Sequence, residues 1–158
     1  MAIKVDLSKT KRARWTTQHF GPEEWKPMVI PNLYCCIGVF IFSETKDKTN
    51  PIYSITAAHL PPHGGKEIKR VRKEFMQKLC NDLRYSEPYL IVIAGGKINT
   101  IHNMVHYRRS LRYFIFPFKW KFPNVQIMAF RPSLETVSTR FGYSLRNGFR
   151  VTRFVLPK

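Results

Sequence analysis

Two residues of this sequence, Cys36 and His59, have the chemistry of a nucleophile and its base. Cys36 opens an apolar run, and His59 ends the next stretch that is typical of a β-strand. If the two stretches pair as an antiparallel hairpin, their outer ends meet, and those ends carry Cys36 and His59. A neighbouring imidazole can lower the pKa of a thiol and later move its proton, so this pair could perform covalent catalysis. A buried structural cysteine, and a histidine that only ends a strand, are the alternative.

Three short motifs surround this pair. In chain order they are Leu33–Phe42 (LYCCIGVFIF), Thr56–Pro61 (TAAHLP) and Ile91–Lys97 (IVIAGGK). Together they resemble the CheD-like protein glutamine deamidases, which share their Cys–His core with the cytotoxic necrotising factor-like toxins. In that family a turn of small residues leads into a Cys and an alternating apolar strand, a second strand ends in Ala-His before Leu-Pro, and a later strand ends in Gly-Gly. The resemblance covers residues 32–97.

This resemblance implies a reaction and a role for each residue. Cys36 would attack the side-chain amide carbon of a glutamine in a protein substrate, and His59 would activate the thiol and protonate the departing ammonia. Hydrolysis of the thioester would leave glutamate, without a metal or an organic cofactor. The resemblance further implies a bacterial toxin or effector, a virulence factor secreted into the cytoplasm of a target or host cell.

The sequence departs from the family pattern in two places, which leaves the third active-site group open. Tyr34-Cys35 stands where the family has a glycine-serine turn, and Ile30 lies near the place of an upstream threonine. Ser54 and Thr56 are candidates for the group that orients His59. Cys35 is the alternative nucleophile in place of Cys36, and His63 is the alternative base in place of His59.

Hydrophobic periodicity predicts the elements that would hold these residues. It predicts one helix over residues 66–84 and a weaker one over residues 99–111. Strands are predicted over residues 34–42, 52–59, 89–94, 124–130, 141–145 and 149–156, the last two joined by Asn147-Gly148. We therefore expect an α+β fold, with a single mixed or antiparallel sheet, a β-sandwich-like core and two helices packed on the sheet. Residues 1–31 are expected to form a basic N-terminal arm, and residues 32–158 a single catalytic-type domain.

The chain is strongly basic, with 27 Lys and Arg against 10 Asp and Glu and a net charge of +17. Such an excess favours binding to, or steering by, an acidic partner, and we expect an acidic protein substrate. Cations also alternate with aromatic rings between Tyr107 and Lys121, which is typical of a nucleic-acid-binding protein. A nucleic-acid-binding protein or metal-independent ribonuclease is therefore the alternative. The residues expected to form the basic docking surface are Arg108, Arg109, Arg112, Lys119, Lys121, Arg146 and Arg150.

Three further features bear on the class of protein. The sequence lacks an apolar run of about 18 residues, the length that would predict a membrane span. Its first residues lack the apolar segment of a Sec signal. The 3 cysteines are an odd number, which favours reduced thiols over a disulfide framework. We expect a monomer without a membrane span.

Overall fold

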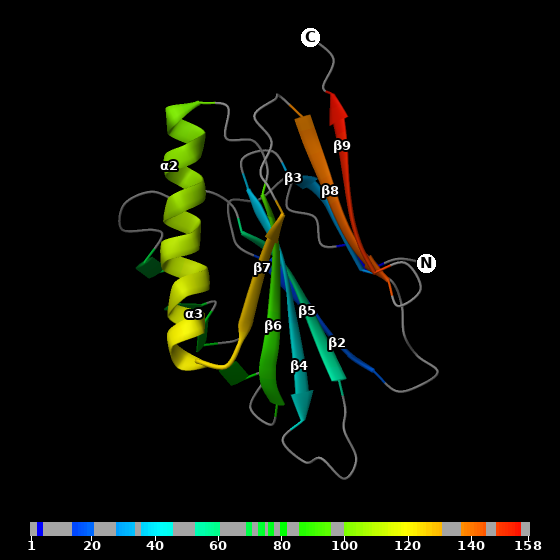
Figure 1. Ribbon diagram of the computed structural model, residues 1–158, viewed down its shortest axis with the longest axis vertical. Helices are drawn as coiled ribbons and strands as arrows, with labels where there is room; N and C mark the ends of the chain where they lie inside the picture. The colour runs from blue at the N-terminus through cyan, green and yellow to red at the C-terminus, as the bar shows by residue number, and fades with distance from the viewer. Residues whose placement is uncertain are drawn as a thin grey trace.

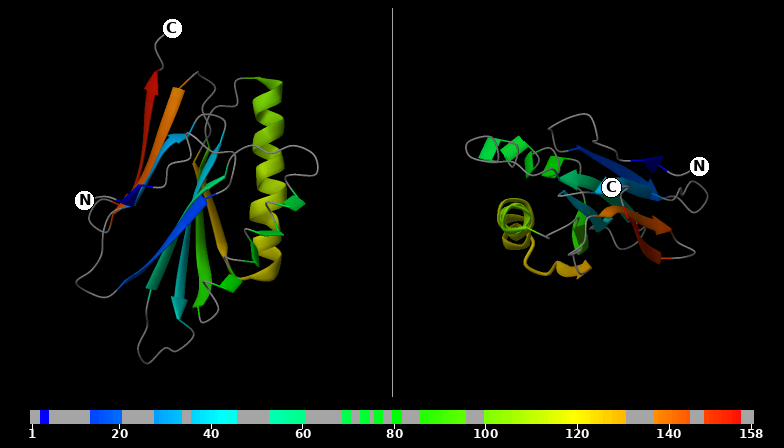
Figure 2. Two further views of the ribbon diagram at one scale, coloured as in Figure 1. Left: turned by 180° about the vertical axis from the view of Figure 1, so that it is seen from behind. Right: turned by 90° about the horizontal axis from the view of Figure 1, so that it is seen from above.

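The residues that the computed structural model describes form three layers, one helical layer and two β-sheets (Figures 1 and 2). The described residues are 3–4, 14–20, 28–33, 36–45, 53–60, 69–70, 73–74, 76–77, 80–81, 86–95, 100–130, 137–144 and 148–155. A five-stranded sheet is the middle layer, with a four-stranded sheet on one face and a long helical segment on the other. The predicted α+β class is confirmed. The prediction of two helices packed on a single sheet is not matched, because the described residues form two sheets and one long helical segment.

The five-stranded sheet has the strand order β2-β5-β4-β6-β7. All neighbours in it are antiparallel except β6 and β7, which run parallel. The predicted hairpin of residues 34–42 and 52–59 is confirmed as β4 and β5, whose pairing runs from Ile37↔Leu60 to Glu44↔Tyr53. The strands are β2 (Arg14–Phe20), β4 (Ile37–Thr45), β5 (Tyr53–Leu60), β6 (Ser86–Gly95) and β7 (Gln126–Phe130).

The remaining strands form a separate sheet, so the prediction of a single sheet is wrong. The order of this second sheet is β1-β3-β8-β9. The physical reason lies in β4 and β6, which are apolar on both faces and therefore need a cover on each side. The helical layer covers one face and the second sheet covers the other. The strands are β1 (Ile3–Lys4), β3 (Met28–Leu33), β8 (Val137–Ser144) and β9 (Gly148–Val155).

Strand alternation divides the core into two clusters. On the helix-facing side, Val39 and Ile41 pack in one cluster with Phe118. On the side between the sheets, Phe40 packs edge-on against Phe141 of β8, with the ring centroids 4.7 Å apart. The middle sheet is thus buried on both faces, and the face of each strand residue decides which layer it contacts.

The helical layer runs from Ile101 to Lys121. It consists of α2 (Ile101–Ser110), a π-helical segment η1 (Leu111–Ile115) and α3 (Phe116–Lys121). The helix predicted over residues 99–111 is confirmed in α2, but the helical segment continues beyond its predicted end. It connects β6 to β7, because parallel neighbours in one sheet need a crossover of this kind.

The segment predicted as a helix over residues 66–84 is described only in part. Each residue that is described there is helical, and Met76 packs against the helix-facing cluster. The described residues are Lys69, Arg70, Lys73, Glu74, Met76, Gln77, Cys80 and Asn81.

Residues 1–31, which the sequence assigns to a basic arm, contribute strands to both sheets. β2 is an edge of the five-stranded sheet, and β1 and β3 belong to the four-stranded one. At the other end of the chain, the predicted hairpin around Asn147-Gly148 is confirmed as β8 and β9. Its last pair is Ser144↔Gly148, and Gly148 has a φ of 66°, a conformation that glycine adopts without strain.

Candidate active site

His59 and Cys36 lie at the same end of the middle sheet. His59 pairs across the β4–β5 ladder with Gly38, and Cys36 directly precedes the first residue of β4. Cys36 therefore stands diagonally across from His59, and diagonal neighbours in an antiparallel pair are about 7–8 Å apart. The outer ends of the predicted hairpin thus carry Cys36 and His59 at neighbouring positions.

The two residues also share one face of the sheet. Ile55 and Ala57 alternate with His59 along β5 and belong to the cluster between the sheets, so His59 points into the same layer. Cys36 is half-buried and packs against this cluster. His59 is buried. A thiol and an imidazole are thereby held at the end of the space between the two sheets.

The chain connection explains why Cys36 lies there. β3 belongs to the four-stranded sheet and ends at Leu33, whereas β4 belongs to the five-stranded sheet and begins at Ile37. The residues between them must carry the chain from one sheet to the other. Cys36 is the last residue of this connection.

Gly38 is a position of the site that sequence reasoning missed. A Cβ atom at Gly38 would lie 2.8 Å from Cδ1 of Leu33, and 3.3 Å from Cδ1 atoms of both Ile30 and Phe141. Side chains of the second sheet therefore occupy the space that a side chain at this position of β4 would need. The signal in the sequence is a glycine inside an apolar strand, which often marks such an approach.

Ser54 and Thr56 lie on the opposite face of β5 from His59. They alternate with Ala58 and Leu60, which belong to the helix-facing cluster. Both hydroxyl-bearing residues are buried. Strand alternation therefore directs these two side chains to the helical layer, whereas His59 points into the layer between the sheets. Cys35, the alternative nucleophile, and His63, the alternative base, lie outside the described residues.

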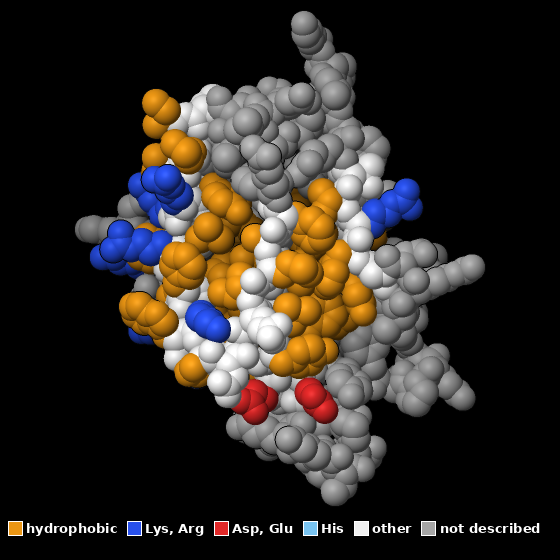
Figure 3. Space-filling model, in the orientation of Figure 1, with side chains coloured by type: hydrophobic (Ala, Val, Ile, Leu, Met, Phe, Trp, Pro, Cys, Tyr) orange, Lys and Arg blue, Asp and Glu red, His pale blue; other side chains and the backbone are white. Residues whose placement is uncertain are grey.

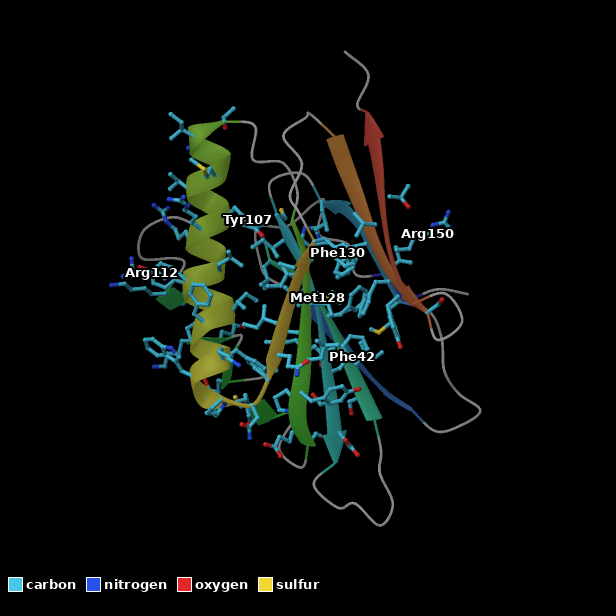
Figure 4. All side chains as sticks on the ribbon, viewed as in Figure 1. Phe42, Tyr107, Arg112, Met128, Phe130 and Arg150 are labelled. Atoms are coloured by element: carbon cyan, nitrogen blue, oxygen red, sulfur yellow. The ribbon has the colours of Figure 1, made fainter. Side chains whose placement is uncertain are left out.

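The residues expected to form one basic docking surface are divided between two layers. Arg112 lies on the helical segment and Arg150 on β9, at opposite sides of the face shown in Figure 4. Arg112 lies over the ring of Tyr113 at 5.8 Å from its centroid. The exposed cations on the helical segment are Arg108, Arg112 and Lys121, while Arg109 is half-buried and Arg146 lies outside the described residues.

Lys119 has a structural role that the sequence did not predict. Its Nζ donates a hydrogen bond to the carbonyl oxygen of Pro123 at 2.9 Å and another to that of Val125. These bonds hold the turn between α3 and β7. Lys119 therefore stabilises the start of β7 and is not a freely available docking cation.

The described residues contain no group of three or more His, Cys, Asp and Glu side chains that could hold a metal ion. Among the same residues, no helix has the length and apolar character needed to cross a membrane. No family model matches the chain, and no curated protein matches it either.

Proposed function

We propose that this protein is a glutamine deamidase of the CheD-like superfamily, with Cys36 as its nucleophile and His59 as its acid–base group. One observation carries the proposal. The β4–β5 register puts the two residues on one face and at one end of the middle sheet. The motifs that suggest this superfamily are the same segments that form β4, β5 and the end of β6. In this reading the protein acts on another protein, as a toxin or effector does.

The proposed reaction has two steps. The Cys36 thiolate attacks the side-chain amide carbon of a glutamine, the C–N bond breaks, and His59 protonates the departing ammonia. A water molecule then attacks the thioester, and His59 takes its proton. Glutamate and the free thiol are formed. Backbone N–H groups near Cys36 would stabilise the negative oxygen that develops in both steps.

The charge of the protein supports an acidic protein as the substrate. The chain carries a net charge of +17, and the described helical segment presents exposed Arg108, Arg112 and Lys121. Like charges of this number repel each other and attract polyanions, so they favour an acidic partner over a neutral or basic one. They also raise the rate of association, which falls with added salt.

The test compares Cys36→Ser with Cys80→Ser. Both cysteines are half-buried, but Cys80 is a helical residue and belongs to neither strand of the β4–β5 hairpin. Incubation with candidate acidic proteins should convert a glutamine to glutamate, seen by mass spectrometry as the exchange of NH₂ for OH. We expect Cys36→Ser to lower the rate by about 10³-fold or more, and Cys80→Ser to leave it unchanged. Full activity in Cys36→Ser would contradict the proposal.

A second pair of variants tests the base. His59→Asn should abolish deamidation, because it removes the group that moves the proton. Thr56→Val is the control, since Thr56 is buried in the same strand but faces the helical layer. We expect Thr56→Val to reduce stability without changing the rate per folded molecule. An equal loss of rate in both variants would argue against His59 as the base.

One observation favours the second candidate function, nucleic-acid binding. Trp120 is 83% exposed and Phe116 49% exposed, beside the exposed cations of the helical segment. Aromatic rings among cations can stack on bases while the cations contact phosphates. This function predicts binding to single-stranded RNA or DNA that weakens steeply with salt and is lost in Trp120→Ala. It also predicts that Cys36→Ser leaves binding and any ribonuclease activity intact.

A further inference from the structure

β7 forms one edge of the five-stranded sheet in the part of the chain that the structure describes. Among the described strands, only β6 pairs with it. Its burial pattern is exposed at every residue except the half-buried Phe130. An edge strand of this kind presents a row of backbone N–H and C=O groups that can pair with another extended chain.

The side chains of β7 lack the usual protection against such pairing. Edge strands in soluble proteins commonly carry charged residues or proline, and β7, with the sequence QIMAF, has neither. Ile127 is 37% and Met128 42% exposed. Figure 3 shows that hydrophobic surface runs across the middle of this face of the molecule. β7 is therefore an accessible strand with an apolar surface beside it.

Cations lie on both sides of this apolar surface. Figure 4 shows Arg112 on the helical segment at one side and Arg150 on β9 at the other, with Met128 and Phe130 between them. Glu44 of β4 and Glu87 of β6 are directly opposite each other in the strand register. In Figure 3 the acidic side chains that can be seen on the described surface lie together, at one end of the apolar region. The surface thus combines an open strand, apolar side chains and flanking cations.

These features favour an extended acidic polypeptide over the other occupants. A second copy of this chain would bring together two molecules that each carry a net charge of +17, which repel each other. A nucleic acid cannot continue the hydrogen-bond ladder of a β-sheet. An acidic polypeptide can pair with β7 through its backbone, place apolar side chains on Met128, and direct carboxylates to the arginines.

We propose that β7 binds an extended segment of an acidic protein as an additional strand of the middle sheet, and that this protein is the substrate. The statement that this protein is the substrate rests on the proposed deamidase function. The statement that β7 binds an extended acidic segment does not depend on it. Phe130 at the end of β7 lies in one row with Ala94, Gly38 and His59 across the sheet. The docking strand and the candidate site are therefore at connected positions of one sheet.

The position of this row gives the distance between a strand docked on β7 and the candidate site. Neighbouring strands are about 4.8 Å apart, so a strand added to β7 lies three spacings, about 14 Å, from β4. An extended chain spans about 3.3 Å per residue, so about five residues bridge this distance. The target glutamine is therefore expected about five residues beyond the docked segment, on the side of Phe130.

The first test uses the Cys36→Ala protein and measures binding by fluorescence polarisation. The probe is a short labelled peptide in which valine and glutamate alternate. It is compared with two versions that carry N-methyl groups on one or the other set of alternate residues. N-methylation removes the donor N–H along one edge of an extended peptide. We expect one methylated version to bind about tenfold more weakly or worse, and the other to bind like the parent.

The second test compares Met128→Lys with Ile101→Lys in the same assay. Ile101 is 77% exposed at the start of α2, so both variants place the same cation on an exposed apolar position. The added charge attracts an acidic peptide, so weaker binding can come only from the altered strand surface. We expect a loss of about tenfold or more in Met128→Lys and no loss in Ile101→Lys, with both variants melting as folded proteins.

Three results would overturn the proposal. The first is equal binding of both methylated peptides, or equal affinity of the two lysine variants. The second is a nucleic acid that binds more tightly than the peptide and loses affinity in Met128→Lys. The third is a dimer that Met128→Lys dissociates. Because binding is measured with Cys36→Ala, its outcome is independent of turnover. If Cys36 proves dispensable for activity while the peptide binds as expected, the deamidase proposal is contradicted and the proposal of docking on β7 is supported.

Discussion

His59 lies directly across the β4–β5 ladder from Gly38, and this pair links the candidate site to the packing of the two sheets. Gly38 has no side chain on the face that His59 occupies, and Leu33 of the second sheet comes closest there. Cys36 stands two residues before Gly38 on the same face. A change that separates the sheets at Gly38 therefore acts at the position that lies between the candidate thiol and the candidate imidazole.

Gly38→Ala should destabilise the protein and reduce its activity. The new Cβ would lie 2.8 Å from Cδ1 of the buried Leu33, so the sheets must separate or the side chains must move. Overpacking of this kind costs about 1–3 kcal/mol in the free energy of unfolding, measured by denaturant titration. Gly142→Ala is the control, because its nearest contact would be at 3.6 Å. Equal stability of the two variants would contradict this account.

The hairpin of β4 and β5 could be predicted from the sequence because its signals are local. An apolar run, a polar turn and a second apolar run fix both the strands and their antiparallel pairing. The positions of Ser54 and Thr56 could also have been predicted. Strand residues alternate between faces, so an even-numbered residue of β5 cannot share the face of His59. Neighbours of His59 on its own face are therefore at odd-numbered positions of β5.

The second sheet could not be predicted in the same way. β3 pairs with β8, which lies more than a hundred residues further along the chain, and no local pattern specifies such a pairing. The helical segment around Pro117 was missed for a different reason. A proline inside an aromatic stretch predicts an interruption, but near the start of α3 its missing N–H needs no partner.

Lys119→Met should lower stability, whereas Lys121→Met should not. Lys119 donates to the carbonyl oxygens of Pro123 and Val125, and its loss leaves the turn before β7 without these bonds. We expect a decrease of about 1–2 kcal/mol in the free energy of unfolding. Lys121 is exposed at the end of α3, so its replacement should change stability by less than about 0.5 kcal/mol. A greater loss of stability in Lys121→Met than in Lys119→Met would contradict this role of Lys119 in the turn.

Phe40→Ala should be among the most destabilising single substitutions in the space between the sheets. Phe40 is fully buried and contacts Phe141 edge-on, with Phe149 also near it. Removal of such a ring leaves a cavity and costs about 3–5 kcal/mol. Phe40→Leu keeps most of the volume and should cost less than half as much. A calorimetric comparison of the two variants measures the cavity, and equal melting temperatures would show that the sheets close over it.

Alkaline solution should destabilise the protein partly through Tyr107. Tyr107 packs against the helix-facing cluster, and burial raises the pKa of its phenol above 10.0. A raised pKa in the folded state means that the unfolded chain loses this proton first. The contribution of Tyr107 to stability is therefore fully present below pH 10.0 and is lost as the pH rises through the folded-state pKa. The free energy of unfolding should fall with increasing pH in that range.

Tyr107→Phe cannot ionise, so its stability should fall less steeply with alkaline pH than that of the unchanged protein. Tyr89→Phe serves as the control, because Tyr89 is exposed on β6. Denaturant titrations across the alkaline range measure the free energy of unfolding. Phenolate absorbance recorded in parallel measures the ionisation of the tyrosines. Burial also raises the pKa of Tyr143, between the sheets, so Tyr143→Phe should change the profile in the same direction. Identical alkaline profiles for Tyr107→Phe and the unchanged protein would show that the phenol reaches solvent before the helical layer unfolds.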